Sequence, residues 1–223
     1  KSLKNNSIVN SDQNPLNPSL SSLIEKKDPY YSGFSTDNSL DSISGSNSFV
    51  EGLMFGGRWG NTDPDNDTST DLKYYLYESY ERNNWGNTTW SFVSKEIDAI
   101  EATHNAYSDV ANITFTRTEN KSSAEIKWGS IYTNQYGGRA GPPVEDYLAY
   151  SGDIEMAYNS YWSGINSGSL DPGSYYFKIF SHELGHALGL SHPHDTITTK
   201  GITYEKFPGV DNPYDGGDNY LNS

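Results

Sequence analysis

Residues 181–192 read SHELGHALGLSH, and this stretch decides how the rest of the chain is interpreted. His182 and His186 are four residues apart, so on an α-helix they lie one turn apart and about 40° from each other around the axis. Two imidazoles in this arrangement can bind the same metal ion. Glu183 lies about 60° beyond His186, beside such an ion but without needing to ligate it. The spacing therefore predicts a helical metal site with a carboxylate next to it.

A glycine and a third histidine complete the pattern. A residue at the place of Gly189, just after a helix, commonly takes a positive φ, which glycine adopts without strain. The turn would bring His192 back to the ion from outside the helix. Three neutral imidazoles and one water make a catalytic zinc site with an open position. We therefore predict that His182, His186 and His192 bind Zn²⁺ and that Glu183 is the general base acting on metal-activated water. The alternative is coincidence, but three of the five histidines fall at the required positions.

The other side of the same helix is apolar, which predicts how the helix is anchored. An arc of roughly 100° on this side contains apolar residues only. They are Phe177, Phe180, Leu184, Ala187 and Leu188. We expect a helix over residues 175–188 with one face in the core and the other presenting the metal. Gly185 and Ala187 are small enough to let other backbone approach.

The remaining apolar patterns indicate an α+β domain. Runs of β-branched and aromatic residues predict strands at 72–80, 112–117, 124–128 and 153–158. Residues 136–143 end in two prolines, which is typical of an edge strand or a loop. A second long helix is expected at 90–109, and an apolar helical turn or two at 49–55. The expected architecture is a small mixed twisted sheet with two main helices and an active-site cleft.

Composition divides the chain near residue 45. Residues 1–45 are rich in Ser, Asn, Asp and Pro, and we expect a tail or prosegment there, with a short helix near residues 20–26. Residues 46–223 are expected to form the compact domain. The N-terminus has no apolar leader core, so we expect either a leader already removed or an export signal outside this sequence.

The charge and the absence of cysteine exclude several classes of protein. The sequence carries 29 acidic and 15 basic residues, for a net charge of −14, and it has no cluster of Lys and Arg. Nucleic-acid binding and attachment to anionic membranes are therefore disfavoured. No apolar run is long enough to span a membrane. Without cysteine the chain cannot form disulfides, thiolate zinc sites or a cysteine nucleophile.

Other polar residues carry weaker signals. His194 could be a spare ligand, although a solvated loop residue is the preferred interpretation, and His104 is expected on the surface or in the core. Asp195 could orient a ligand histidine, with a salt bridge or cap preferred. Two groups of acidic residues could bind a structural Ca²⁺, although plain turns are preferred because the offsets of a calcium loop are missing. These groups are Asp63, Asp65 and Asp67, and Asp211, Asp215 and Asp218.

The motif resembles that of the serralysin family of metzincin zinc peptidases. Pro193 follows the third histidine directly, DVANITF at 109–115 is similar to the family's helix-to-strand junction, and GRWG at 57–60 is similar to the start of its peptidase domain. The resemblance covers roughly residues 46–215. It implies a secreted, extracellular endopeptidase with zinc at the bottom of a cleft and an extended substrate along an edge strand. By position, the substrate-binding residues would be Gly138, Arg139, Ala140 and Gly141.

The sequence departs from that family after the third histidine. The family has a Met-turn there, followed by a Tyr that can ligate the metal, whereas Met54 and Met156 both precede the motif. The calcium-binding repeats usual after the peptidase domain are also missing. We therefore expect a peptidase domain that is incomplete at its C-terminus, whose partners are protein or peptide substrates and its own C-terminal remainder. The alternatives are an impaired zinc-binding pseudo-peptidase and, given the many Tyr and Trp residues, a binding module of a larger secreted protein.

Overall fold

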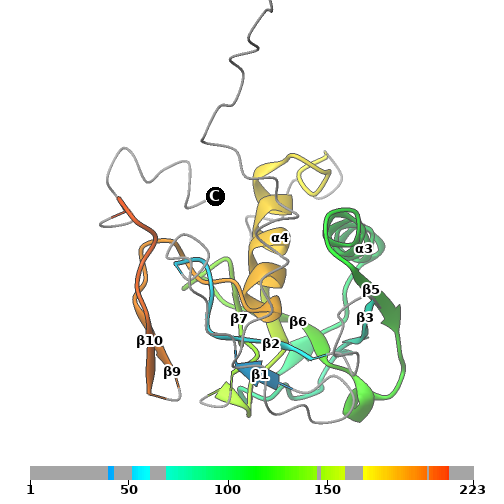
Figure 1. Ribbon diagram of the computed structural model, residues 1–223. Coiled ribbons are helices and arrows are strands. Elements are labelled where there is room, and N and C mark those ends of the chain that lie inside the picture. The colour runs from blue at the N-terminus through cyan, green and yellow to red at the C-terminus, as the bar shows by residue number, and fades with distance from the viewer. Residues whose placement is uncertain are drawn as a thin grey trace, which may run out of the picture.

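The computed structural model describes residues 40–42, 52–60, 69–144, 147–158, 168–199 and 201–210 (Figure 1). Two long helices and several short strands make up this part of the chain. The helices are α3 (Ser94–Ser108) and α4 (Tyr175–Leu188), with a single 3-10 turn, η1 (Lys121–Ser123), between β5 and β6. The strands are β1 (Leu40–Ser42), β2 (Gly57–Trp59), β3 (Thr70–Leu76), β4 (Thr89–Trp90), β5 (Ile113–Arg117), β6 (Ile126–Tyr132), β7 (Gly138–Ala140), β8 (Asp153–Tyr158), β9 (Ile197–Thr199) and β10 (Ile202–Tyr204).

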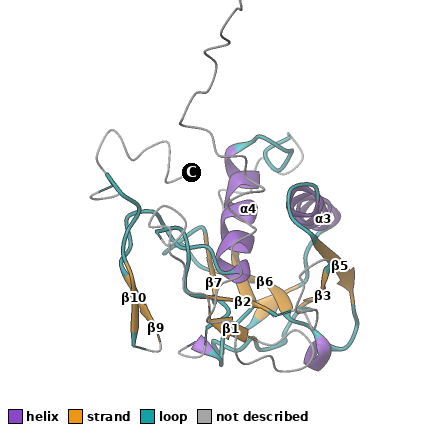
Figure 2. Ribbon diagram, viewed as in Figure 1, coloured by secondary structure: helices purple, strands orange, loops and turns teal. Residues whose placement is uncertain are grey.

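One sheet dominates the molecule. Its strand order is β5-β3-β6-β8-β7, and β4 pairs with the second half of β6. β3 runs parallel to β5 and β6, and β6 runs parallel to β8, while β7 is antiparallel to β8 at the sheet edge. Figure 2 shows both helices on the same side of this sheet. The predicted α+β class, with a mixed sheet and two main helices, is confirmed.

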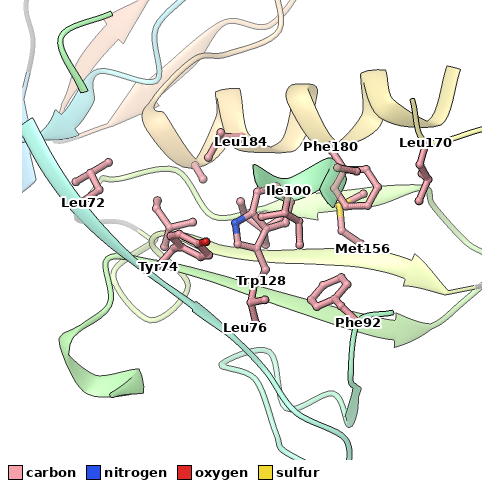
Figure 3. Packing of buried hydrophobic residues seen from close by; sticks show 14 residues of the cluster. Leu72, Tyr74, Leu76, Phe92, Ile100, Trp128, Met156, Leu170, Phe180 and Leu184 are labelled. Carbon is pink, nitrogen blue, oxygen red and sulfur yellow. The ribbon is translucent and has the colours of Figure 1, made fainter. Parts of the chain in front are cut away.

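The core lies between the two helices and the covered face of the sheet (Figure 3). Phe180 and Leu184 of α4 and Ile100 of α3 are fully buried there, together with Trp128 of β6. His104 also belongs to the core. Its Nε2 accepts a hydrogen bond of 3.2 Å from Trp128 Nε1, and burial lowers its pKa to about 3, so the ring is neutral. The apolar face of α4 predicted from its periodicity is therefore what anchors the helix.

The predicted elements agree with the structure with several exceptions. The strand predicted at residues 72–80 is β3, which ends at Leu76, and the strand predicted at residues 124–128 is β6, which starts two residues later and extends to Tyr132. The first helix begins at Ser94 instead of residue 90, because Trp90 pairs in β4 and the Glu96 carboxylate accepts the Val93 N–H at the helix start. The helical turn predicted over residues 49–55 is wrong for residues 52–55, which form a turn and a bridge between Met54 and Leu190. The expected helix near residues 20–26 and both aspartate groups lie outside the described residues.

The pairing of β1 with β2 bears on the proposed division of the chain. Leu40 pairs with Trp59 and Ser42 with Gly57, so residues from the predicted tail contact the start of the predicted domain. The boundary at residue 45 stays a prediction. Within the described ranges, neither helix has the length and apolar character needed to cross a membrane.

Candidate metal centre

Helix α4 carries the first two histidines on the side that faces away from the core. Ser174 caps its start, since the Ser174 Oγ accepts the Phe177 N–H at 3.2 Å. Phe180 and Leu184 are completely buried, whereas His182 and His186 are only partly buried. The 3.6-residue period of the helix thus separates an anchoring face from a face that presents the imidazoles.

The three predicted ligands converge on one point. The Nε2 atom of His182 lies 2.9 Å from that of His186 and 3.1 Å from that of His192, and the His186 and His192 Nε2 atoms are 3.1 Å apart. A tetrahedral zinc ion with bonds of about 2.0–2.1 Å needs ligand nitrogens about 3.3–3.4 Å apart. The triangle of nitrogens therefore fits a zinc ion after a small outward adjustment.

Hydrogen bonds on the far side of two rings fix their tautomers. His186 Nδ1 lies 2.7 Å from the Leu190 carbonyl oxygen, and His192 Nδ1 lies 2.9 Å from Asp195 Oδ2. Both partners only accept, so each Nδ1 carries the proton and each Nε2 directs a lone pair inward. Lone pairs brought this close repel each other unless a cation lies between them. The donor set is therefore suited to a divalent metal such as zinc.

Burial also keeps the helical imidazoles neutral. Loss of solvent, followed by the nearby imidazoles of His186 and His192, lowers the pKa of His182 to about 4. Burial likewise lowers the pKa of His186. Neutral imidazole is the form that binds metal, so both side chains are ready ligands at neutral pH.

The predicted glycine turn brings in the third histidine. Gly189 has a φ of 108°, and a side chain there would collide with the Gly57 carbonyl oxygen. Residues 53–55 run beside this turn. The Phe55 N–H donates to the Gly189 carbonyl at 2.8 Å, and the Ser191 N–H donates to the Leu53 carbonyl at 3.0 Å. A segment more than 130 positions earlier in the chain thus holds the turn that returns His192 to the site.

Glu183 lies against the edge strand of the sheet. Its side chain is 5% exposed, and burial raises the pKa of its carboxyl to about 8. A Cβ atom added to Gly138 would lie 2.7 Å from the Glu183 Cγ, so this carboxylate packs directly on the β7 backbone. Only glycine at this position leaves room for Glu183 where it stands.

The four predicted substrate-binding residues lie on β7 and just after it. Gly138 packs against the Glu183 side chain. Arg139 points its guanidinium to the other face of the sheet, where its Nε lies 2.5 Å from Glu155 Oε2. Ala140 pairs with Ile154, and the Gly141 N–H donates to the Asp153 carbonyl. If these residues contact a substrate, the main chain of β7 is the part that is available.

Of the two polar residues after His192, His194 differs from its preferred interpretation, whereas Asp195 forms contacts that fit both a salt bridge and an orienting role. His194 is not a solvated loop residue, because it is partly buried and its ring stacks on His192 with centroids 5.1 Å apart. Its Nε2 lies 3.5 Å from Asp195 Oδ1. Asp195 contacts both imidazoles, which agrees with the alternative that it orients a ligand histidine. The spacing of Asp195, three residues after His192, was the only sequence signal for this contact.

A pocket of about 370 Å³ opens beside the three histidines. It runs along α4 on the side away from β7, and its walls include Tyr107, Leu190 and Pro193, with Lys178 at one end. Tyr107 comes from α3, fills the space left by Gly185 and donates a hydrogen bond of 3.0 Å to the Ser181 carbonyl. A side chain, not the expected backbone, therefore uses the room that Gly185 provides.

Fold and site together define a class of protein, namely metallopeptidase-type domains with three histidines presented by a helix and the turn after it. Comparison with known families agrees. The family model described as "Matrixin" (Peptidase_M10) matches residues 79–211, more than half of the chain. The chain therefore belongs to the matrixin family of peptidases.

Known relatives agree with the predicted resemblance to serralysin-like metzincins. A serralysin from Photorhabdus luminescens is 31% identical over 142 residues, covering 62% of this chain and 28% of that protein. Serralysin B from Dickeya chrysanthemi is 31% identical over 118 residues, covering 51% and 24%. Karilysin from Tannerella forsythia is 24% identical over 191 residues, covering 79% and 34%. The chain thus spans about a quarter to a third of these relatives.

Among solved structures, myroilysin is 17% identical with a TM-score of 0.39, covering 61% of this chain and 52% of that one.

Proposed function

We propose that this chain is the catalytic part of a zinc-dependent endopeptidase, with Zn²⁺ held by His182, His186 and His192. The observation that carries the proposal is the convergence of three Nε2 atoms within 3.1 Å of one another, beside a buried carboxylate. A zinc ion bound there supplies a Lewis acid that acidifies water and polarises a peptide carbonyl. Membership of the matrixin peptidases supports the same chemistry.

The role proposed for Glu183 is that of general base and then general acid. A divalent cation bound by the neighbouring histidines would favour the ionised form of Glu183 against the burial that raises its pKa. The carboxylate would then accept a proton from the attacking water and later deliver that proton to the leaving amine. Packing on Gly138 holds the Glu183 side chain between α4 and β7, while the neighbouring His182 faces the other imidazoles. Its burial keeps competing water away from this proton transfer.

The proposed substrate is an extended peptide aligned with β7. Just outside the paired residues of β7 and β8, the Ala157 N–H donates to the Gly137 carbonyl and the Gly141 N–H donates to the Asp153 carbonyl, which places Arg139 and Glu155 in the next hydrogen-bonded pair. Because such pairs alternate along an antiparallel ladder, the main-chain groups of Gly138 and Ala140 point away from β8. No other strand in the described part of the chain pairs with that edge. Pairing through backbone groups gives affinity without strict sequence preference.

Three further statements belong to the proposal: the location rests on the resemblance to serralysins, the domain boundary on composition, and the calcium on two groups of aspartates. We place the protein outside the cell, assign residues 46–223 to the peptidase domain, and retain a structural Ca²⁺ as a second cofactor. The acidic groups that suggested calcium lie outside the described residues.

The decisive experiment compares the wild type with Glu183→Ala and His186→Ala on casein. The wild type should cleave casein, lose activity with a chelator and regain it with zinc. Glu183→Ala should retain zinc, measured by atomic absorption, but lose at least about 10²-fold in kcat/KM. His186→Ala should lose both zinc and activity. Thr196→Ala, an exposed position in the following loop, is the control that should change neither. Undiminished cleavage by Glu183→Ala would refute its role, and zinc binding without any cleavage by the wild type would contradict the enzyme assignment.

A further inference from the structure

A buried carboxylate on the sheet face away from the helices is not used by the proposed chemistry. Glu155 lies in β8 between Ile154 and Met156, whose side chains belong to the core under α4. Because side chains alternate along a strand, Glu155 points to the opposite face. It is nevertheless 0% exposed. Burying a carboxylate costs free energy unless its oxygens accept hydrogen bonds. The donors around Glu155 therefore indicate its structural role.

The partners of Glu155 come from two separate segments. Asn83 and Asn87, in the loop before β4, donate their side-chain amides to Oε1, the second at 2.7 Å. Tyr136 Oη donates to Oε2 at 2.9 Å and Arg139 Nε donates to the same oxygen at 2.5 Å. Glu155 thus ties this loop and the β7 segment to strand β8 through four hydrogen bonds.

The guanidinium of Arg139 contacts two aromatic rings as well as the Glu155 carboxylate. It lies 4.6 Å from the centroid of the Trp85 ring and 5.2 Å from that of the Tyr136 ring, besides its ion pair with Glu155. Cation–π contacts of this kind favour arginine over other side chains. The side chain of Arg139 therefore lies on the sheet face away from the helices, held by Glu155, Trp85 and Tyr136.

This anchor falls at the middle of a weakly attached strand. β7 has only three residues and pairs with β8 alone among the described strands, and Arg139 pairs directly with Glu155 at its centre. The preceding residue, Gly138, is the surface on which Glu183 packs, and a Cβ added to Gly137 would lie 3.0 Å from Ile179 Cδ1 of α4. A shift of β7 would therefore move both the support of Glu183 and the free strand edge.

We propose that Arg139 and Glu155 are positioning residues that lock β7 in register behind Glu183 and so set the edge along which a peptide aligns. The inference rests on the proposed peptidase function for its consequence in catalysis. Its structural part, the locking of β7, stands independently and is tested without activity.

The test compares Arg139→Gln and Arg139→Lys with a matched control, Arg117→Gln. Arg117 lies on β5, the opposite edge strand of the same sheet, where it forms an ion pair of 3.8 Å with the exposed Glu119. Amide hydrogen exchange of Ala157 and Gly141, whose N–H groups form hydrogen bonds just outside the two ends of the β7–β8 pairing, reports the attachment of the strand. In Arg139→Gln both amides should exchange at least tenfold faster, while amides of the β3–β5 pair stay unchanged. Arg139→Lys should lie between Arg139→Gln and the wild type, and Arg117→Gln should leave Ala157 and Gly141 unchanged.

Peptide hydrolysis provides the second readout. Arg139→Gln should keep zinc and fall at least tenfold in kcat/KM, with kcat lowered as well as KM raised, because both Glu183 and the substrate edge depend on β7. Unchanged exchange at Ala157 and Gly141 would overturn the inference, whatever the activity. If exchange rises but hydrolysis by a wild type known to be active does not fall, β7 is locked for stability only and the positioning role is wrong. If the wild type hydrolyses no peptide, the proposed function is refuted. The hydrogen-exchange result then still tests whether Arg139 and Glu155 hold β7 in place.

Discussion

Two of the three predicted ligand histidines have a second contact that aims the ring. His186 is aimed by the Leu190 carbonyl and His192 by Asp195, and both contacts put the proton on Nδ1. Such partners fix the ring direction and raise the basicity of the nitrogen that binds the metal. At the scale of single residues, the geometry of the candidate centre therefore depends on the Leu190 carbonyl and the Asp195 carboxylate as well as on the imidazoles.

Asp195 should therefore influence metal affinity without touching the metal. We expect Asp195→Ala to weaken zinc binding by about 10- to 100-fold, because His192 loses the partner that orients it. Asp195→Asn keeps an acceptor but loses the charge, so its loss should be smaller. Competition with a chromogenic chelator measures the Kd, and Thr196→Ala is the control. Equal zinc affinity in Asp195→Ala and the wild type would show that the hydrogen bond is dispensable.

The turn at Gly189 allows a second test at this scale. Gly189→Ala forces a side chain into a positive-φ position and into the Gly57 carbonyl oxygen, whereas Gly173→Ala meets the same strain at a φ of 88° with open space around it. We expect Gly173→Ala to lower the free energy of unfolding by about 1–2 kcal/mol, and Gly189→Ala by at least about 2 kcal/mol more because of overpacking. Urea denaturation in the presence of a chelator measures both. Similar losses for the two variants would mean that the close approach to Gly57 does not matter.

At the scale of elements, α3 supports α4 and is itself fastened to the sheet through a histidine. Tyr107 of α3 bonds the Ser181 carbonyl of α4. His104, one turn earlier, stacks on Phe115 of β5 at 4.3 Å and accepts the indole N–H of Trp128. A neutral, buried imidazole thus joins the helix to two strands, and its protonation would require a charge in the core.

His104 should make the protein less stable in acid. Its pKa is about 3 in the folded chain against the ordinary 6.5, so between these values the unfolded chain binds a proton that the folded chain does not. The free energy of unfolding should therefore fall by up to about 1.4 kcal/mol per unit as the pH drops from 6.5 towards 3. His104→Gln keeps an acceptor for Trp128 and removes this contribution. Urea denaturation between pH 4 and 7 should show a shallower decline for the variant, and the ligand histidines contribute equally to both proteins. Parallel curves would contradict the assignment.

At the scale of the whole molecule, the metal centre joins segments that are far apart in the sequence. Trp59 Nε1 donates to the Ala187 carbonyl at 2.9 Å, and the Phe207 N–H donates to the Pro193 carbonyl at 2.8 Å. Segments before β3 and after β10 thus meet around the end of α4. An ion bound by His182, His186 and His192 would fasten the loop after α4 to the helix and stabilise this arrangement.

Zinc should accordingly raise the melting temperature. Free zinc at 100 times its Kd stabilises the folded state by about 2.7 kcal/mol, which for a chain of this size corresponds to roughly 5–10 °C in Tm. Differential scanning calorimetry with and without a chelator measures the shift. Glu183→Ala should keep the shift and His186→Ala should lose it. A chelator that leaves the Tm of the wild type unchanged would argue against a metal at this centre.

Sequence reasoning succeeded where a property is local. The helix over residues 175–188 has the predicted bounds, and its apolar arc contains Phe180 and Leu184, both fully buried. Residues 138–140 are an edge strand, as the nearby prolines indicated. The helical turn predicted for residues 49–55 is wrong at residues 52–55, because the apolar residues there resemble a helix, whereas Met54 pairs with Leu190, a partner that no local pattern reveals.

The sequence by itself determined which imidazoles converge, because the helical period and the strain-free turn at Gly189 follow from residue spacing and backbone sterics alone. Only the tertiary structure decided how those side chains are supported. The packing of Glu183 on Gly138 and the bonding of Arg139 to Glu155 join residues whose separation in the chain gives no signal, since they come together only when the sheet and helices pack.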